Sequence, residues 1–416
     1  MALKPLRQVA IAGMMRLSYS LISPAMANLT TPPSTPCKFM QRWTAVQHEL
    51  IPELRADVGV LTPKLEKVIH TLEWVRIEEF VAASWCGVGR PPHERSWLAN
   101  AFVAKSVLGL GTTTALIERL TIDRSLRRIC GFPLHRKLPS ESTFSRAFEE
   151  FAESKLAERV HEALIKAQLG DTLVGHISRD ATAVEARERP IRSARSENVA
   201  ADDEAATKDG EPKAEAAAPQ RKRGRPRRGE TRTPAKTSPL ARQRQQTLPQ
   251  MLAEMPTACD RGTKCNAQGY KVSWNGYKLH LDTADCGVPI SALLSSASMH
   301  DSLAAIPLSL MSAQRVTNCY DLMDAAYCSG VLREFSCELG HVPLIDHNPR
   351  KGEKIEFSPA EAIRYNERTA AERTNARLKD EFGGTNVMVR GHNKVKSHLM
   401  FGVLCLAADQ LMRLRH

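Results

Sequence analysis

Residues 365–379 read YNERTAAERTNARLK, and Arg368, Glu372 and Lys379 follow Tyr365 at offsets of 3, 7 and 14. On an α-helix such offsets fall close to one face, so an acid, two cations and an aromatic ring would share one stripe. Alone, the stripe also fits a solvated helix face joined by charge pairs such as Arg368 and Glu372, each worth about 0.2–0.5 kcal/mol. The rest of the chain has to decide between these interpretations.

The stretch around this stripe carries helix start and stop signals. Ser358-Pro359-Ala360-Glu361 is a capping-box pattern with proline at the first helical position. No Pro or Gly follows before Gly383-Gly384. These signals predict one helix from residue 359 to residue 381.

Composition narrows the class of protein. The 416 residues are 42% hydrophobic and 25% charged, which is typical of a globular chain long enough for two or three domains. The net charge of +12 favours a polyanionic partner, with nucleic acid as the foremost candidate. None of the ten cysteines forms a C-x-x-C pair and no zinc-ligand spacing occurs, which indicates the reduced thiols of an intracellular protein.

Residues 1–39 differ from the rest of the chain. Lys4 and Arg7 precede an apolar stretch, as in a secretory signal, but Arg16 interrupts the apolar run. We therefore expect a disordered or mis-started N-terminus. No other stretch reaches the roughly 18–20 apolar residues that a membrane span needs, so no membrane partner is predicted.

Residues 40–170 show helical patterning with recurrent basic residues. Helices are expected to begin at Pro63 and to occupy residues 95–108, 112–120, 125–129 and 144–169. One interpretation is a DNA-binding domain that places a helix in a major groove. The other is an all-α accessory or dimerisation domain, and the residues favour the two equally.

Residues 187–257 are rich in Ala, Glu, Lys, Arg, Pro and Gln and almost free of aromatic residues. Such a composition cannot bury a core, so a disordered basic insertion is predicted. Within it, Arg223-Gly224-Arg225-Pro226 resembles an AT-hook, a short arm that enters the minor groove of A·T-rich DNA. The alternative is a polybasic linker that contacts phosphates without sequence preference.

Strands and helices alternate on both sides of this insertion. A strand is expected at residues 172–178, a hairpin at 277–285 and 288–297, and further strands at 318–323 and 342–345. Helices are expected at 303–316, 329–339 and 397–414. This alternation predicts a mixed sheet flanked by helices.

Three acids stand out in this framework. Asp180 and Asp324 follow predicted strands, and Glu372 projects from the predicted helix. Three carboxylates so placed can hold two divalent cations such as Mg2+, which prefer oxygen ligands. Two ions about 3.5–4 Å apart would activate a water and stabilise the leaving oxygen of a phosphoryl displacement. Asp321, three residues before Asp324, is the rival for the second ligand.

These residues resemble bacterial insertion-sequence transposases of the DDE type with the Y-(2)-R-(3)-E-(6)-K signature. Tyr365, Arg368, Glu372 and Lys379 match all four positions and all three spacings. Asp324-Ala325-Ala326-Tyr327 is similar to the family's D-x-x-Y motif, which favours Asp324 over Asp321. Further similar pieces are Asp180-Ala181-Thr182, residues 274–280, the His300-Asp301 turn and the helical block from about residue 90 to residue 151.

The resemblance implies an α/β fold, an RNase H-like mixed sheet flanked by helices and preceded by an all-α N-terminal domain. The catalytic domain would occupy residues 171–416, interrupted at about 187–257. Asp180, Asp324 and Glu372 would bind two Mg2+ ions, with Mn2+ as a substitute. Arg368 and Lys379 would contact phosphates and Tyr365 would support the DNA, while Arg223 and Arg225 belong to the basic arm. His300 is expected to play a structural role.

The leading hypothesis is a DNA transposase that binds the terminal inverted repeats of its element, cleaves the 3′ ends and joins them to target DNA. It would act as a homodimer in the cytoplasm, associated with the bacterial nucleoid. One alternative is a non-catalytic DNA-binding protein derived from a transposase. A second is an RNase H-like nuclease without strand transfer.

Overall fold

The computed structural model describes residues 61–81, 93–190, 238–265, 268–349 and 353–415. The described residues all belong to one compact unit, which spans residues 60–416. The predictions for residues 1–39 and for the arm residues Arg223 and Arg225 lie outside the described residues.

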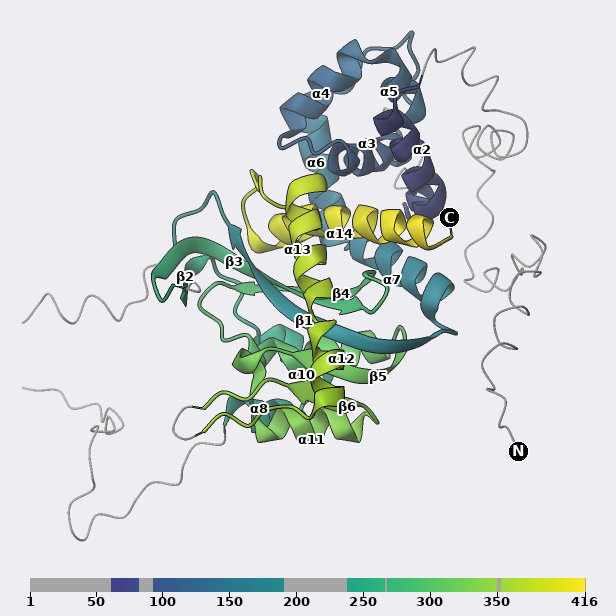
Figure 1. Cartoon of the computed structure of the whole chain (residues 1–416). Coiled ribbons are helices and arrows are strands. Elements are labelled where there is room, and N and C mark those ends of the chain that lie inside the picture. The colour runs from purple at the N-terminus through teal and green to yellow at the C-terminus, as the bar shows by residue number, and fades with distance from the viewer. Residues whose placement is uncertain (1–60, 82–92, 191–237, 266–267, 350–352, 416) are drawn as a thin grey trace, which may run out of the picture. The chain divides into compact units, whose positions relative to one another are not determined.

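Helices make up the described chain before the first strand (Figure 1). Thr62 caps the first of them, as the Thr-Pro signal predicts, by accepting a hydrogen bond from the Leu65 amide. The elements are α2 (Pro63–Val75), the 3-10 turn η2 (Ile77–Phe80), α3 (Arg95–Val107), α4 (Thr113–Ile122), α5 (Arg124–Ile129), α6 (Glu141–Glu153) and α7 (Leu156–Leu169).

The prediction of one helix over residues 144–169 is wrong. The chain breaks between α6 and α7, where Lys155 has a left-handed backbone with φ of 51°. Neither Gly nor Pro marks this break, so the local sequence carries no signal for it. Both helices pack against α14 (His392–Arg415), and this burial offsets the strain of a left-handed lysine.

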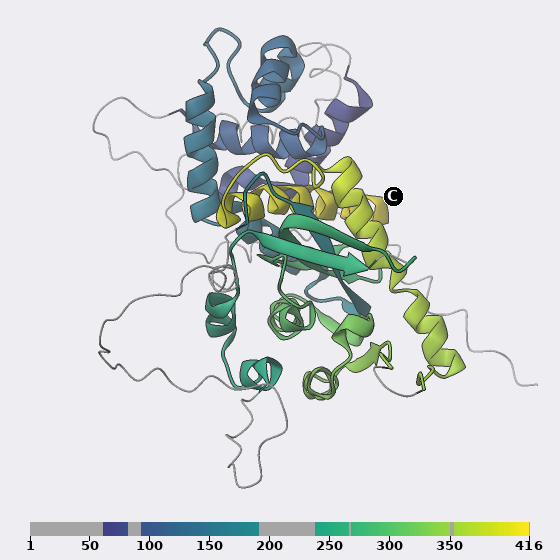
Figure 2. The same ribbon diagram turned by 90° about the vertical axis from the view of Figure 1, so that its left-hand side faces the viewer.

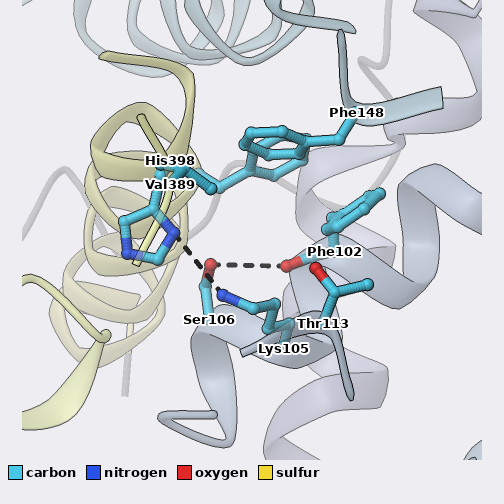
Figure 3. A pocket seen from close by; sticks show the side chains of 8 residues that line it. Phe102, Lys105, Ser106, Thr113, Phe148, Val389 and His398 are labelled. Atoms are coloured by element: carbon cyan, nitrogen blue, oxygen red, sulfur yellow. Dashed lines mark hydrogen bonds between the residues drawn. The ribbon is translucent and has the colours of Figure 1, made fainter. Parts of the chain in front are cut away.

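The C-terminal helix α14 completes the core of the helical part. It packs against α2, α3, α6 and α7, so segments from the two ends of the chain share one apolar interior. Phe102 lies 4.9 Å from Phe148 and 5.9 Å from Phe401 between ring centroids. Beside these rings Lys105 is buried, with its Nζ 3.5 Å from Nδ1 of His398, at a cavity of about 10 Å3 that has room for about one water (Figure 3).

A mixed six-stranded sheet forms the second half of the unit. Its strands are β1 (Leu173–Glu185), β2 (Asp260–Cys265), β3 (Lys271–Ala284), β4 (Pro289–Ser296), β5 (Thr317–Met323) and β6 (Val342–Ile345). The order is β2-β3-β1-β5-β6, with β4 paired to β3. The pairs among β1 to β4 are antiparallel, while β1–β5 and β5–β6 are parallel. This arrangement confirms the predicted fold class, a mixed sheet flanked by helices and preceded by a helical region.

Two strand predictions need correction. Asp180 does not follow a strand end, because β1 continues through it to Glu185, with Asp180 opposite Leu281 of β3. Strand β2, with the sequence DRGTKC, is absent from the prediction. Its glycine and charges give no apolar alternation, and the strand is made by pairing with an extended β3.

Helices cover the sheet on both faces. The helix α10 (Ser302–Ala313) contacts β3, β4 and β5, and α13 (Thr369–Glu381) contacts β1 and β3. Ser312 of α10 donates a hydrogen bond to Asp282, whose neighbour across the strands is Arg179, whereas Asn375 of α13 contacts Asp180. Since successive strand residues point to opposite faces, α10 and α13 lie on opposite sides of the sheet (Figure 2).

The predicted insertion is too long at its C-terminal end. Residues 239–254, assigned to the disordered stretch, form α8 (Pro239–Gln243) and α9 (Leu248–Glu254). Met251 of α9 is buried in a cluster that includes Ile306 of α10 and Met323 of β5. Composition fails here because a few apolar side chains, Met251 and Leu240 among them, dock these short helices onto an existing core.

The predicted helix over residues 359–381 is also interrupted. It consists of α12 (Pro359–Asn366), with the expected capping box at Ser358, and α13. Between them, the amides of Arg368 and Ala371 bond to carbonyls three residues back, which tightens the backbone at this point. The remaining elements are the 3-10 turn η4 (Ala325–Tyr327) and α11 (Gly330–Glu338).

Candidate active site

The sheet register brings the two predicted aspartates together. In the parallel pairing of β1 with β5, Arg179 lies beside Met323, so Asp180 and Asp324 are the next residues on neighbouring strands. Side chains at matched positions of neighbouring strands share a face, and this face is the one that α13 covers. Asp324 directly follows β5 and caps η4, where its Oδ1 accepts a hydrogen bond of 2.9 Å from the Ala326 amide.

Both carboxyl groups have perturbed acidity. Burial raises the pKa of Asp180, the Asp324 carboxylate raises it further, and Arg368 and Lys264 oppose the rise. Burial also raises the pKa of Asp324, with a contribution from Asp301 and opposition from Arg368 and Lys264. Two carboxylates that repel each other can bind a divalent cation between them. The neighbouring cations Arg368 and Lys264 can bind a phosphate.

Asp321, the rival of Asp324, has a different environment. Its buried carboxylate accepts hydrogen bonds from Ser336 and Asn318 and lies 3.1 Å from Nδ1 of His341. On the strand, Asp321 and Asp324 are three residues apart and therefore point to opposite faces. The geometry separates Asp321 from Asp180 and gives it the satisfied partners of a structural acid.

Glu372 does not pair with the two aspartates in this structure. Its side chain is 54% exposed and accepts a 2.6 Å hydrogen bond from Arg368, the residue that directly precedes α13. The α13 residue that reaches the pair is Asn375, whose Nδ2 donates to Oδ2 of Asp180 at 3.0 Å. The three predicted acids thus lie in one region, but only two of them interact.

The other residues of the Tyr365 stripe flank this region. Burial raises the pKa of Tyr365 to about 12, so the ring stays neutral, and it packs 4.8 Å from Phe357. Arg368 lies over the Tyr365 ring at 5.9 Å. Burial lowers the pKa of Lys379, and Lys264 lowers it further while Asp180 opposes this. His300 bonds to Ser302 at the start of α10, in keeping with a structural role.

The sequence analysis missed three contributors to this site. Lys264 belongs to β2, which had no local signal. Asp301 pairs with Lys278 at 2.9 Å, and its role becomes visible only through its effect on Asp324. Asn375 could have been found, because it is the i+3 neighbour of Glu372 and such neighbours share a helix face.

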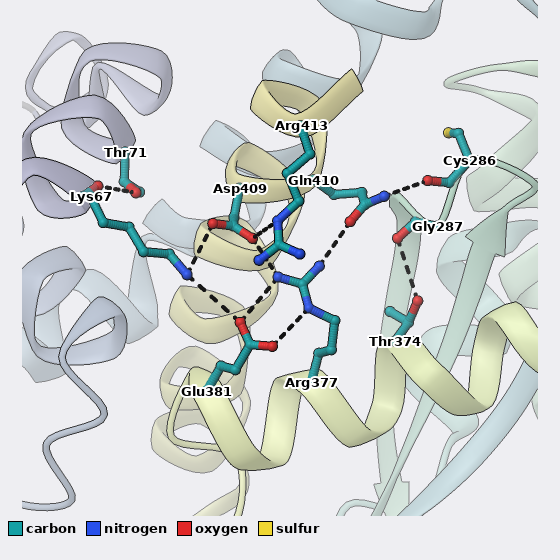
Figure 4. Close-up of polar contacts among 10 residues, drawn as sticks. All are labelled: Lys67, Thr71, Cys286, Gly287, Thr374, Arg377, Glu381, Asp409, Gln410 and Arg413. Atoms are coloured by element: carbon teal, nitrogen blue, oxygen red, sulfur yellow. Dashed lines mark hydrogen bonds and ion pairs between the residues drawn. The ribbon is translucent and has the colours of Figure 1, made fainter. Parts of the chain in front are cut away.

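The second half of α13 is anchored firmly. Arg377 makes a two-point contact with Glu381 and also bonds to Asp409 and Gln410 of α14 (Figure 4). Asp409 is buried and also binds Lys67 of α2 at 2.9 Å. This network ties the helix that carries Glu372 and Asn375 to the helical core.

Three carboxylates would imply a divalent cation, so the oxygen atoms present at the site should suit such an ion. No group of three or more His, Cys, Asp or Glu side chains suited to a metal ion occurs in the described parts of the chain. The available oxygens are those of Asp180 and Asp324 together with the amide oxygen of Asn375, a buried acceptor without a partner among the described residues. Carboxylate and amide oxygens suit Mg2+ or Mn2+, so the residues fit a hard cation.

Two family models match the chain. A transposase domain model (DUF772) matches residues 52–150, and a transposase DDE domain model matches residues 255–408. The two matches indicate a DDE-type transposase family. No curated protein and no solved structure shows a significant match to the chain.

The transposase matches cover the site unevenly. Asp324, Glu372 and Asn375 lie in the DDE domain, while Asp180 lies in neither matched segment. The first match spans the block of helices from α2 to most of α6. In the described ranges, no helix combines the length and apolar content that crossing a membrane requires.

Proposed function

We propose that this transposase binds the terminal inverted repeats of an insertion sequence, cleaves their 3′ ends and transfers them to target DNA. The observation that carries the proposal is the register match of Asp180 with Asp324 on the sheet face covered by α13. The DDE domain match over residues 255–408 supports the same reaction class.

Asp180, Asp324 and Glu372 are the proposed ligands of Mg2+, or of Mn2+ in its place, with two ions in the full site. Such ions lower the pKa of a bound water and stabilise the developing charge on phosphate oxygens. The register of β1 with β5, in which Arg179 lies beside Met323, supports a place for Asp180 next to Asp324. Glu372 would join them once its pair with Arg368 is broken.

The cations around the acids would bind the phosphates of the DNA substrate. Arg368 would exchange the Glu372 carboxylate for a DNA phosphate, which frees Glu372 and anchors the strand at once. Lys379 and Lys264 would contact neighbouring phosphates, and Tyr365 would support the DNA backbone. The reading of Arg223 and Arg225 as a basic DNA arm remains part of this proposal.

The assembly follows from the reaction. Because two element ends must be held together, we propose a homodimer as the active species. A cytoplasmic, nucleoid-associated location follows from DNA as substrate. The helical region, matched by the first transposase model, is the proposed reader of the terminal repeats.

The test is cleavage of a labelled duplex that carries the element's own end, with Mg2+ or Mn2+ and with EDTA. Asp180→Asn and Asp324→Asn should each abolish metal-dependent nicking while DNA binding is retained. Nicking that survives Asp324→Asn but not Asp321→Asn would move the second ligand to Asp321. Nicking without joining of pre-cut ends would favour a nuclease over a transposase.

One observation favours the alternative of a non-catalytic DNA-binding protein. Glu372 points to solvent and pairs with Arg368 instead of completing the acid pair. If that arrangement persists on DNA, the protein should bind element ends in a salt-dependent manner and cleave none of them under any divalent metal.

A further inference from the structure

Asn375 is a buried residue of α13 that has no role in the proposed reaction described above. Its side chain is only 6% exposed, and its Nδ2 donates to Oδ2 of Asp180 at 3.0 Å. Its Oδ1 is buried and has no hydrogen-bond partner among the described residues. An unpaired buried acceptor costs about 1–3 kcal/mol, so a group is expected to satisfy it.

The surroundings indicate what that group is. Asn375 lies on the helix that faces Asp180 and Asp324, two carboxylates that raise the local negative charge. An amide oxygen beside such a pair adds an oxygen donor without adding a fourth negative charge. Hard divalent cations accept this mixture of carboxylate, amide and water oxygens.

We propose that Asn375 is a positioning residue of the cation site. Through Nδ2 it holds the Asp180 carboxylate toward Asp324, and through Oδ1 it offers an additional oxygen to the hydrated cation. The inference rests on the proposed function, because it assigns Asn375 to the cation that the carboxylates would bind. It goes beyond that function by giving α13 a second polar contribution, independent of Glu372.

A second asparagine supplies a matched control. Asn318 is 4% exposed, donates from Nδ2 to Oδ1 of Asp321 at 3.2 Å, and also has an Oδ1 without a partner among the described residues. It differs in the acid that it contacts. Asp321 already accepts from Ser336 and lies beside His341, whereas Asn375 is the side-chain donor bonded to Asp180.

The experiment measures Mn2+ binding to the full-length, DNA-free protein by the loss of the free-ion paramagnetic resonance signal. Asn375→Leu should weaken Mn2+ binding about tenfold to a hundredfold, the usual effect of losing an orienting partner of a ligand. Asn318→Leu should lower the unfolding temperature and leave Mn2+ affinity unchanged. Asn375→Asp should recover Mn2+ binding relative to Asn375→Leu, because the carboxylate restores an oxygen toward the cation.

A second readout covers a loss of folding in the leucine variant. Saturating Mn2+ should raise the unfolding temperature of the wild type and of Asn375→Asp more than that of Asn375→Leu. Equal Mn2+ affinity in the wild type and Asn375→Leu, with loss in Asp180→Asn, would overturn the role of Asn375 and leave the proposed function standing. An absence of saturable Mn2+ binding by the wild type would also overturn it, and the cleavage assay would then judge the function separately.

Discussion

Helix α13 and the residue that precedes it carry two arginine–glutamate pairs at the same spacing, and the two are held very differently. Arg368 and Glu372 share one hydrogen bond, with the glutamate 54% exposed. Arg377 and Glu381 share two, and the arginine also reaches Asp409 and Gln410. The first pair is the one that a DNA phosphate would open under the proposed function, while the second joins α13 to α14.

Under the proposed function, the difference lets one helix serve both stability and catalysis. Under the proposed function, Glu372 has to leave Arg368 and join Asp180 and Asp324, so a pair that exchanges partners is useful at this end. The end with Arg377 contacts α14, and Glu381 also pairs with Lys67 of α2 at 3.7 Å, so a network of ion pairs holds the backbone in place. Because the ion pairs of Arg377 fix one end of α13, side chains at the other end can change partners without moving the backbone.

The largest expected effect is on DNA cleavage, when the glutamate at each end of α13 is replaced by glutamine. Glu372→Gln should lower metal-dependent cleavage about a thousandfold or more and change the free energy of unfolding by less than about 0.5 kcal/mol. Glu381→Gln should leave cleavage within about twofold and reduce stability by about 1 kcal/mol. Cleavage kinetics and urea unfolding of the two variants measure both quantities. Equal loss of cleavage in both would erase the distinction between the ends.

The arginines provide a smaller, purely energetic contrast. Arg377→Met should destabilise the protein by about 2 kcal/mol, because Glu381 and the buried Asp409 lose a partner, although Asp409 keeps Lys67. Arg368→Met should change stability by less than about 0.5 kcal/mol, because its partner Glu372 is 54% exposed and water replaces the lost hydrogen bond. The midpoints of urea denaturation, compared at an unchanged dependence of the unfolding free energy on urea concentration, measure the stability of both variants. A greater loss in Arg368→Met would show that the pair near the acids is structural.

A third contrast uses pH. Burial lowers the pKa of His398 to about 3, and its Nε2 bonds to the Gly383 carbonyl just beyond α13. Because the unfolded histidine titrates near 6.5, the unfolded state binds more protons below that pH, and stability falls as pH falls. From pH 7 to pH 5 the loss from this residue is about 2 kcal/mol.

The corresponding measurement compares urea unfolding of the wild type and His398→Gln at pH 7 and pH 5. The variant should lose about 2 kcal/mol less over this interval, since glutamine keeps a donor for the carbonyl and does not titrate. His161 and His280 are buried with lowered pKa values and titrate in both proteins, so they cancel in the difference. An identical loss in the two proteins would mean that protonation of His398 does not weaken the anchored end.

Much of the fold could be predicted from the sequence because its signals are local. The capping box at Ser358, the Thr62-Pro63 helix start, and the apolar strands around residues 320 and 343 all have short-range physical causes. The left-handed Lys155 and the strand β2 had no such cause, since each depends on packing with distant segments.

The sequence by itself determined the candidates for the chemistry: the motifs single out Asp180, Asp324 and Glu372, and the charge indicates a polyanionic partner. Only the tertiary structure decided how they are arranged. Strand register puts Asp180 beside Asp324, opposite faces of β5 separate Asp321 from it, and helix packing brings Asn375 to Asp180. The reason is physical, because residue spacing defines a face along one element, whereas contact between elements depends on how their faces pack.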